Sequence, residues 1–316
     1  MVELKAAYAA CLNDARRHYE NFPVASLLVP RSQRPHIAAV YAFARAADDF
    51  ADEGQRSIAE RHRLIDGWLR RLREAASAGE SASKVEPGEP GHTHEIFMAL
   101  GSTIRQKALP IHLLEDLLSA FRQDVTSSRY ASWDDLLDYC RRSANPVGRL
   151  VLRIAGYDQP QLDAWSDAIC TGLQLTNFWQ DVKSDFDRGR IYLPEEELRL
   201  HGASVDALRR SLVGGRIDER WALALASAAR RTRALFEAGL PLCDAVRGRL
   251  KYELRATWLG GTRVLARLET AKYDVIRERP TLGAGDGPWL AWRMATWPLD
   301  SRGSDTLARG KPPVRS

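Results

Sequence analysis

The sequence predicts an all-α chain that folds as a bundle of about ten helices with short connections. Apolar residues recur at three-and-four spacing over most of the chain, as Ile111, Leu114, Leu117, Leu118 and Phe121 do. This is the period of a helix with one buried face, whereas runs that alternate apolar and polar residues, as strands do, are scarce. Proline and glycine divide the helical segments. These breaks fall at Pro23, Pro30, Pro35, Gly54, Pro110, Pro146, Gly156, Pro160, Pro194, Gly202, Gly214 and Pro241.

Length and composition indicate one domain. The chain has 316 residues, of which 45% are hydrophobic and 28% charged, a globular composition that can build a large core. We expect a single helical domain over residues 1–280, followed by a tail rich in Gly, Pro and Arg over residues 281–316. Inside the domain, residues 79–94 are small and polar, so we predict a flexible loop there.

The tail contains Trp289, Trp292 and Trp297. Tryptophan is used more often for burial than for membrane contact, so we expect these side chains to cover an apolar surface of the protein.

Charge and cysteine usage limit the class of protein. Four scattered cysteines with no Cys-x-x-Cys pair suggest neither a disulfide framework nor a zinc site. No signal peptide and no apolar run of about 18 residues is recognised, so we expect a cytoplasmic protein. The formal charge of +5 favours anionic partners such as diphosphates or a membrane surface. Nucleic acid is not expected, because no basic stretch is interleaved with aromatic residues.

Two segments place acidic side chains at helical spacing. In the first, the spacings of four, three and four put four polar side chains on one face of a helix. They are Tyr41, Arg45, Asp48 and Asp52. In the second, spacings of three, four and four do the same. Its members are Gln174, Asn177, Asp181 and Asp185.

Mg²⁺ is the natural partner of these two stripes. Carboxylates at i and i+4 repel each other, so stripes that face the inside of a bundle need a cation. Mg²⁺ prefers oxygen ligands and takes only one or two carboxylates from each element, completing its shell with water and phosphate oxygens. A solvated, salt-bridged helix face would explain one such stripe, with Arg45, Lys183 and Arg188 as partners. Two matching stripes favour metal binding.

Arg188 and Arg190 follow the second stripe in a turn. Guanidinium groups suit bidentate contact with phosphate, although helix termination with charge balance explains them equally well. His92 and His94 lack a distant partner in the sequence, so we expect them to be solvated and not to bind a metal.

Three motifs together resemble the squalene and phytoene synthases, over roughly residues 10–280. They are Tyr-x-x-x-Arg-x-x-Asp-Asp-x-x-Asp from Tyr41 to Asp52, the Tyr139-Cys140 pair with the turn at Gly148, and the second stripe followed by Arg188-Gly-Arg-Ile-Tyr-Leu-Pro194.

The resemblance implies an isoprenoid synthase helical bundle with a central active-site cavity. Both stripes would face this cavity and grip a prenyl diphosphate through about two or three Mg²⁺ ions. The implied metal ligands are Asp48, Asp52, Asn177, Asp181 and Asp185. The implied substrate-binding residues are Tyr41, Arg45, Gln174, Asn177, Arg188 and Arg190. The implied catalytic residues are the four aspartates together with Tyr139, which would lie near the reacting carbons. An acid near Asp124 approaches the diphosphate in this family, but a surface helix acid explains Asp124 equally well.

Three departures resemble the hopanoid-pathway branch of the family, the hydroxysqualene synthases. The turn after Tyr139 contains Asn145-Pro146, the second stripe contains Phe178-Trp179-Gln180, and the N-terminal motif reads Asn21 to Ser26. The resemblance implies Mg²⁺-dependent ionisation of presqualene diphosphate, rearrangement, and capture of the cation by water to give hydroxysqualene. No NADPH is expected, because Gly283 to Gly287 does not join a strand to a helix.

Two alternatives remain at this point. One is a transferase that condenses two prenyl diphosphates head to head, as presqualene diphosphate and phytoene synthases do. The other is a non-catalytic isoprenoid-binding paralogue. For an enzyme, an apolar product suggests transient contact with the inner face of a membrane, and the resemblance to the hopanoid-pathway branch suggests handover to other enzymes of that pathway.

Overall fold

The computed structural model describes residues 2–17, 29–78, 85–283 and 285–304, with side chains given up to residue 297. The N-terminal motif from Asn21 to Ser26 lies outside the described residues, as do residues 79–84 of the predicted loop and residues 305–316 of the predicted tail.

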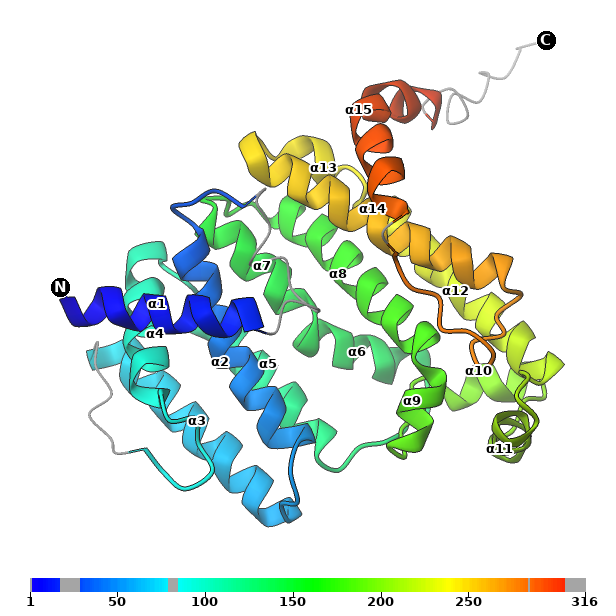
Figure 1. Ribbon diagram of the computed structural model, residues 1–316, viewed down its shortest axis with the longest axis horizontal. Helices are drawn as coiled ribbons and strands as arrows, with labels where there is room; N and C mark the ends of the chain where they lie inside the picture. Colours follow the sequence, from blue (N-terminus) through cyan, green and yellow to red (C-terminus); the bar gives the residue numbers. More distant parts are fainter. Residues whose placement is uncertain (1, 18–28, 79–84, 284, 305–316) are drawn as a thin grey trace, which may run out of the picture.

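The described chain is helical, which confirms the predicted fold class (Figure 1). Its only β-type pairing is an isolated bridge between Arg129 and Ile191. The helices are α1 (Val2–Arg17), α2 (Arg34–Asp52), α3 (Ile58–Ala78), α4 (Thr93–Lys107), α5 (Ile111–Asp124), α6 (Trp133–Ser143), α7 (Asn145–Ile154), α8 (Pro160–Gln180), α9 (Val182–Asp187), α10 (Glu195–Leu200), α11 (Val205–Gly214), α12 (Glu219–Gly239), α13 (Leu242–Ala245), α14 (Gly248–Thr270) and α15 (Asp286–Ser304).

There are more helices in the described chain than the ten expected from the sequence. The extra ones include α9, α10 and α13, which have six, six and four residues. Such short helices show too few turns for a hydrophobic period to be recognised.

The buried apolar residues form two clusters. The N-terminal core is drawn mainly from α1 to α5, and the C-terminal core mainly from α6, α8 and the helices that follow. Phe43 of α2 lies in the first, and Leu175 of α8 lies in the second. The acidic stripe of α2 and that of α8 are therefore carried by different cores, and α7 contributes to both.

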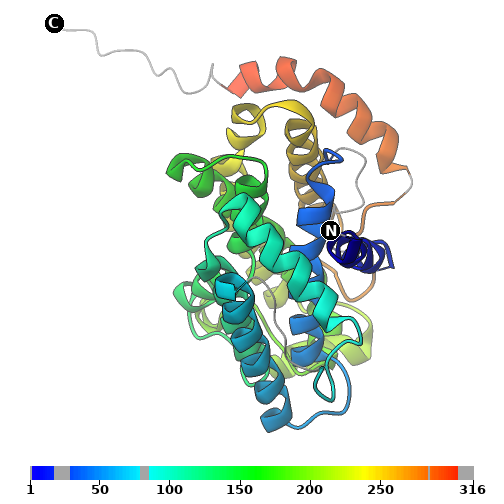
Figure 2. The same cartoon turned by 90° about the vertical axis from the view of Figure 1, so that its left-hand side faces the viewer.

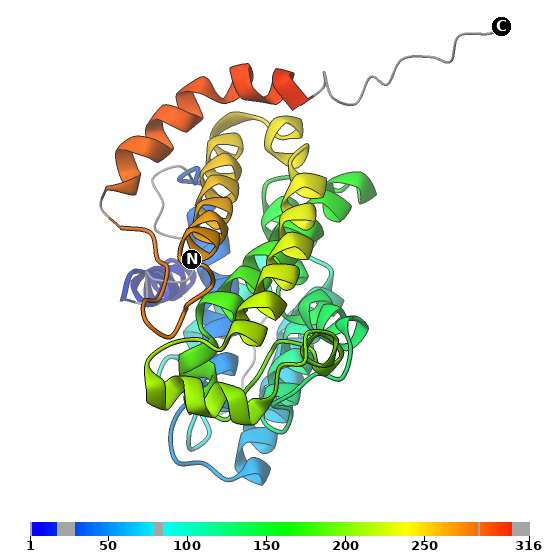
Figure 3. The same cartoon turned by 90° about the vertical axis from the view of Figure 1, so that its right-hand side faces the viewer.

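Helices α8, α12 and α14 contribute many of the buried residues of the C-terminal core. Figure 3 shows α12 and α14 side by side. Gly239, at the end of α12, allows a close approach to α8. A Cβ atom built at Gly239 would lie 2.5 Å from Ile169 Cγ1 and 2.8 Å from the carbonyl oxygen of Trp165.

The predicted tail contains helix α15, which runs across the end of α14 (Figure 2). Asp286, at its start, is buried and pairs with Arg267 of α14 at 2.8 Å. The buried ring of Trp297 packs edge-on against Trp258 with centroids 5.5 Å apart. Trp292, in contrast, is 58% exposed. The tail was not expected to be helical, because Gly and Pro dominate its composition.

The described part of the predicted flexible loop is anchored. Glu89 pairs with Arg71 of α3 through two hydrogen bonds of 2.9 Å. Both side chains are almost fully buried, at 2% and 1% exposure. The buried ion pair between Glu89 and Arg71 therefore holds residues 85–92 against α3, because breaking it would leave an unpaired buried charge. No helix within the described ranges is long and apolar enough to cross a membrane.

Replacing Gly239 with Ala should destabilise the protein. The added methyl group would overlap the backbone of α8, and overpacking of this kind costs about 2 kcal/mol. The free energy of unfolding in urea measures the effect. Gly214→Ala is the matched control, because nothing lies within 4 Å of a Cβ at the exposed end of α11. Equal midpoints for the two variants would contradict the close approach of α8 and α12.

Candidate active site

Helix α2 presents the first acidic stripe. It begins with Pro35 in its first turn and buries a face rich in alanine and phenylalanine, which leaves the polar stripe on the opposite side. Arg45 lies along this stripe, 2.7 Å from Asp49, 2.8 Å from Glu53 and 3.6 Å from Asp48. The guanidinium group therefore partly offsets the negative charge of its own helix.

The spacing of the second stripe suggested one continuous helix, but the structure divides the stripe between two helices. Helix α8 ends at Gln180, and Asp181 is the junction residue between α8 and α9, with φ −102° and ψ 12°. The backbone bonds nevertheless keep the helical interval across the junction. Asp181 N donates to Asn177 O at 2.9 Å, and Asp185 N donates to Asp181 O at 2.8 Å. The three side chains consequently still reach one pocket.

This pocket, of about 170 Å³, is called the polar pocket here. It brings together all the predicted site residues except Tyr41 and Arg45, and it adds Asp124, Phe178 and Tyr192. Its lining consists of Asp48, Asp52, Asp124, Tyr139, Gln174, Asn177, Phe178, Asp181, Asp185, Arg188, Arg190 and Tyr192. Tyr41 and Arg45 line an adjoining middle pocket of about 230 Å³, which shares Asp48, Tyr139 and Gln174 with the polar pocket.

Negative charge accumulates in the polar pocket. Burial, reinforced by Asp52, raises the pKa of Asp48 to about 6. Burial, reinforced by Asp181, raises the pKa of Asp185 to about 7. Burial also raises the pKa of Asp124 to about 7. Carboxylates with raised pKa values in a pocket gain most from a bound cation.

Two arginines neutralise part of this charge. Arg190 donates to Asp52 at 2.9 Å and to the backbone oxygen of Asp124 at 3.3 Å. Arg279 donates to Asp181 at 3.0 Å. No sequence pattern indicated Arg279, because it lies 98 residues from its partner and outside any acidic or helical pattern.

The residues present fit Mg²⁺. With Asp52 and Asp181 paired to arginines, no three His, Cys, Asp or Glu side chains of the described ranges converge as a ready metal site. The donor set is nevertheless the one that Mg²⁺ prefers, with carboxylate oxygens and the amide oxygen of Asn177 on two facing elements.

Tyr139 lies where the polar and middle pockets meet. Its hydroxyl donates to Asp124 at 2.9 Å, which makes Asp124 part of the site. Burial and the neighbouring Asp124 raise the pKa of Tyr139 well above its usual value, so the phenol stays neutral. Phe178 stacks on Tyr192 with centroids 3.7 Å apart and an interplanar angle of 5°. Tyr139 tilts over the same pair, 6.3 Å from each ring.

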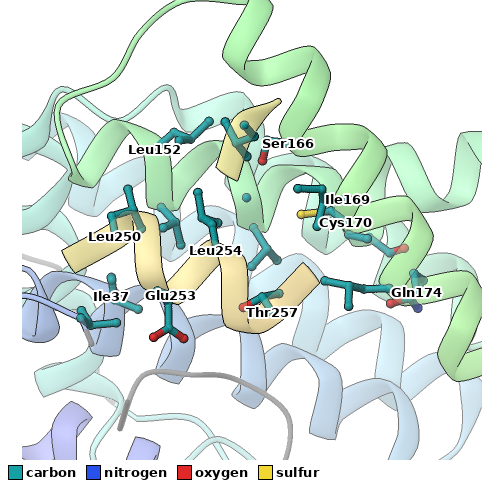
Figure 4. A pocket seen from close by; sticks show the side chains of 18 of the residues that line it. Ile37, Leu152, Ser166, Ile169, Cys170, Gln174, Leu250, Glu253, Leu254 and Thr257 are labelled. Atoms are coloured by element: carbon teal, nitrogen blue, oxygen red, sulfur yellow. The ribbon is translucent and has the colours of Figure 1, made fainter. Parts of the chain in front are cut away.

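The apolar cavity, of about 410 Å³, continues from these pockets between α7, α8 and α14 (Figure 4). Leu250 and Leu254 of α14 face α8 across it, and Gln174 lies at the opposite end from Leu250. Gln174 lines the polar pocket, the middle pocket and the apolar cavity. Gln180, which sequence analysis named among the departures that resemble the hydroxysqualene synthases, is buried and lines none of these three spaces.

Comparisons with known proteins agree with this geometry. The family model described as squalene/phytoene synthase matches residues 15–286. Hydroxysqualene synthase of Sinorhizobium fredii is 33% identical over 84% of this chain and 85% of its own. 15-cis-Phytoene synthase of Synechococcus elongatus is 30% identical over 88% of this chain and 89% of its own. The crystal structure of squalene synthase HpnC from Alicyclobacillus acidocaldarius superposes with a TM-score of 0.76 at 38% identity, covering 87% of this chain and 97% of that one.

Replacing Asp185 with Asn should stabilise the metal-free protein at pH 8. The folded-state pKa of about 7 lies above the ordinary value of 3.8, so the stability that protonation contributes is lost as the pH rises through 7. Removing the charge should raise the melting temperature at pH 8, and the gain should shrink at pH 5. Thermal unfolding measured in a chelating buffer at both pH values tests this.

Asp187→Asn is the control, because Asp187 is exposed and lines none of the three spaces. A gain for Asp185→Asn of the same size at both pH values, or no gain at pH 8, would contradict the raised pKa of Asp185.

Proposed function

The chain belongs to the squalene/phytoene synthase family, and from this premise we propose that it converts presqualene diphosphate and water into hydroxysqualene and diphosphate, with Mg²⁺. One observation carries the proposal: an acidic and arginine-bearing pocket opens, past Gln174, into an apolar cavity. This arrangement suits a substrate with a diphosphate at one end and long hydrocarbon chains at the other.

The diphosphate binds in the polar pocket. Asp48, Asp52, Asn177, Asp181 and Asp185 would hold Mg²⁺ there. When bound, Mg²⁺ supplies Lewis-acid stabilisation of the charge that develops on the leaving diphosphate. Arg190 and Arg279 add fixed positive charge, and Arg188 lines the same pocket. Guanidinium groups are suited to bidentate contact with phosphate oxygens.

The aromatic side chains stabilise the cation that ionisation leaves. Tyr139, Phe178 and Tyr192 form one group beside the carboxylates, and π faces attract positive charge. The hydrogen bond from Tyr139 to Asp124 fixes the phenol, and its raised pKa keeps the hydroxyl protonated. The apolar cavity holds the hydrocarbon chains and keeps bulk water away from the cation.

Water is the proposed nucleophile. Three relatives named hydroxysqualene synthase, at 33%, 34% and 41% identity, support this choice. The phytoene synthase relative at 30% identity keeps head-to-head condensation of two prenyl diphosphates as the second candidate.

Product analysis separates the two reactions. With presqualene diphosphate and Mg²⁺ in ¹⁸O-labelled water, we expect hydroxysqualene that carries ¹⁸O, identified by mass spectrometry. Formation of presqualene diphosphate or phytoene from prenyl diphosphates, with added presqualene diphosphate left unconsumed, would contradict the proposal.

Asp181→Asn should slow diphosphate release at least ~100-fold, because it removes charge from the position where the leaving group is stabilised. A coupled assay for inorganic diphosphate measures the rate. Asp187→Asn is the control and should leave the rate unchanged. If the Asp181→Asn variant released diphosphate at the wild-type rate, the second acidic stripe would have no role in the reaction.

We also propose transient docking on a membrane surface through α15. Pro288, Ala291, Trp292 and Ala295 are exposed at i, i+3, i+4 and i+7, so they form one uncharged stripe. An apolar product leaves more readily into lipid, and an exposed tryptophan suits the membrane interface.

Trp292→Ala should reduce flotation of the full-length protein with anionic liposomes. Leu223→Ala is the matched control, because Leu223 is 53% exposed on α12, away from this stripe. Equal flotation of the wild type and Trp292→Ala would contradict membrane docking through Trp292 of α15.

A further inference from the structure

Ser143, the last residue of α6, carries a hydroxyl that the fold does not use. Its Oγ atom is buried and has no hydrogen-bond partner among the described residues. Buried hydroxyl groups in proteins are normally paired, because an unpaired one loses its hydrogen bonds to water without replacement. A serine near the end of a helix would ordinarily bond a backbone carbonyl of the preceding turn. Among the described residues, the Ser143 hydroxyl is therefore left available to a bound partner.

The position of Ser143 indicates where that partner lies. Ser143 lines both the middle pocket and the apolar cavity. Tyr139 lies one turn earlier on the same face of α6 and lines the middle and polar pockets. From the polar pocket toward the apolar cavity, the order is thus carboxylates, the Tyr139 phenol and then the Ser143 hydroxyl.

Two other polar side chains that line these spaces are less suitable. The Tyr139 hydroxyl is bonded to Asp124. The carboxylate of Glu253 points away from α8 (Figure 4).

We propose that the Ser143 hydroxyl holds the water molecule that captures the carbocation. The inference rests on the proposed function and adds the residue that directs its last step. A lone pair of the water oxygen forms the new C–O bond to the cationic carbon, and one O–H bond of that water then breaks. The proton passes to the diphosphate released in the same turnover, so the serine orients the water and is not the base. Ser143 is a small, neutral group, so it binds water without presenting a strong nucleophile to the cation.

Ser143→Val tests the proposal, because valine has no hydroxyl and matches in shape the threonine of the companion variant Ser143→Thr. With presqualene diphosphate and Mg²⁺, diphosphate release should persist. The ratio of hydroxysqualene to alkenes formed by proton loss should fall roughly fivefold to tenfold, which is the effect expected for one hydrogen bond. Ser143→Thr, which keeps the hydroxyl, should restore the ratio. Thr257→Val is the matched control, since it removes a hydroxyl from the α14 wall of the same cavity and should leave the ratio unchanged.

The outcomes are distinguishable. If Ser143→Val releases diphosphate and gives the wild-type ratio, or if Thr257→Val shifts the ratio as much, the assignment of Ser143 is wrong while the proposed function stands. If the wild type itself releases no diphosphate from presqualene diphosphate, the proposed function fails instead. Ser143→Ala provides a second variant without the hydroxyl should the valine variant not fold, and the same shift in its ratio supports the assignment.

Discussion

The burial of several carboxylates in one polar pocket is the constraint on which the site depends. The carboxylates are carried by helices of two different cores, α2 on one side and α8 with α9 on the other. Burial, reinforced by repulsion from Asp52, raises the pKa of Asp48 to about 6, and burial, reinforced by repulsion from Asp181, raises the pKa of Asp185 to about 7. The Arg190–Asp52 pair joins the two sides and offsets part of this repulsion. The folded protein therefore retains an electrostatic penalty that a bound cation removes, at the place where a diphosphate would need neutralisation.

The polar pocket adjoins the apolar cavity, so the site can bind a molecule that has both a charged end and an apolar end. Gln174 lines the polar pocket and the apolar cavity alike, so the charged end and the hydrocarbon end of one substrate can be held together. The aromatic group of Tyr139, Phe178 and Tyr192 lies at the charged end, where the proposed reaction would leave a cation. In the proposed reaction, ionisation of the diphosphate, stabilisation of the cation and its capture by water would all occur within the polar pocket, the middle pocket and the apolar cavity.

Helical spacing predicted which acids share a face, because that property depends only on local geometry. The spacing could not show that the second stripe breaks at Asp181, since the backbone bonds at the break keep the interval of four residues. It also could not identify Arg279, which reaches Asp181 only through the tertiary fold. Asp124 stayed ambiguous in the sequence because its role depends on the hydrogen bond from Tyr139. The helix after residue 280 was hidden by a composition rich in Gly and Pro, and contacts with α14 hold it in place.

The most direct test of the account is a titration of Mn²⁺, as a spectroscopic substitute for Mg²⁺, monitored by electron paramagnetic resonance with and without inorganic diphosphate. Diphosphate should strengthen Mn²⁺ binding, because its oxygens complete a coordination shell that the two acidic stripes begin. Substituting both Asp52 and Asp181 with Asn should abolish this strengthening. Mn²⁺ binding that is independent of diphosphate, or unchanged in the double variant, would contradict a shared metal and diphosphate site between α2 and α8.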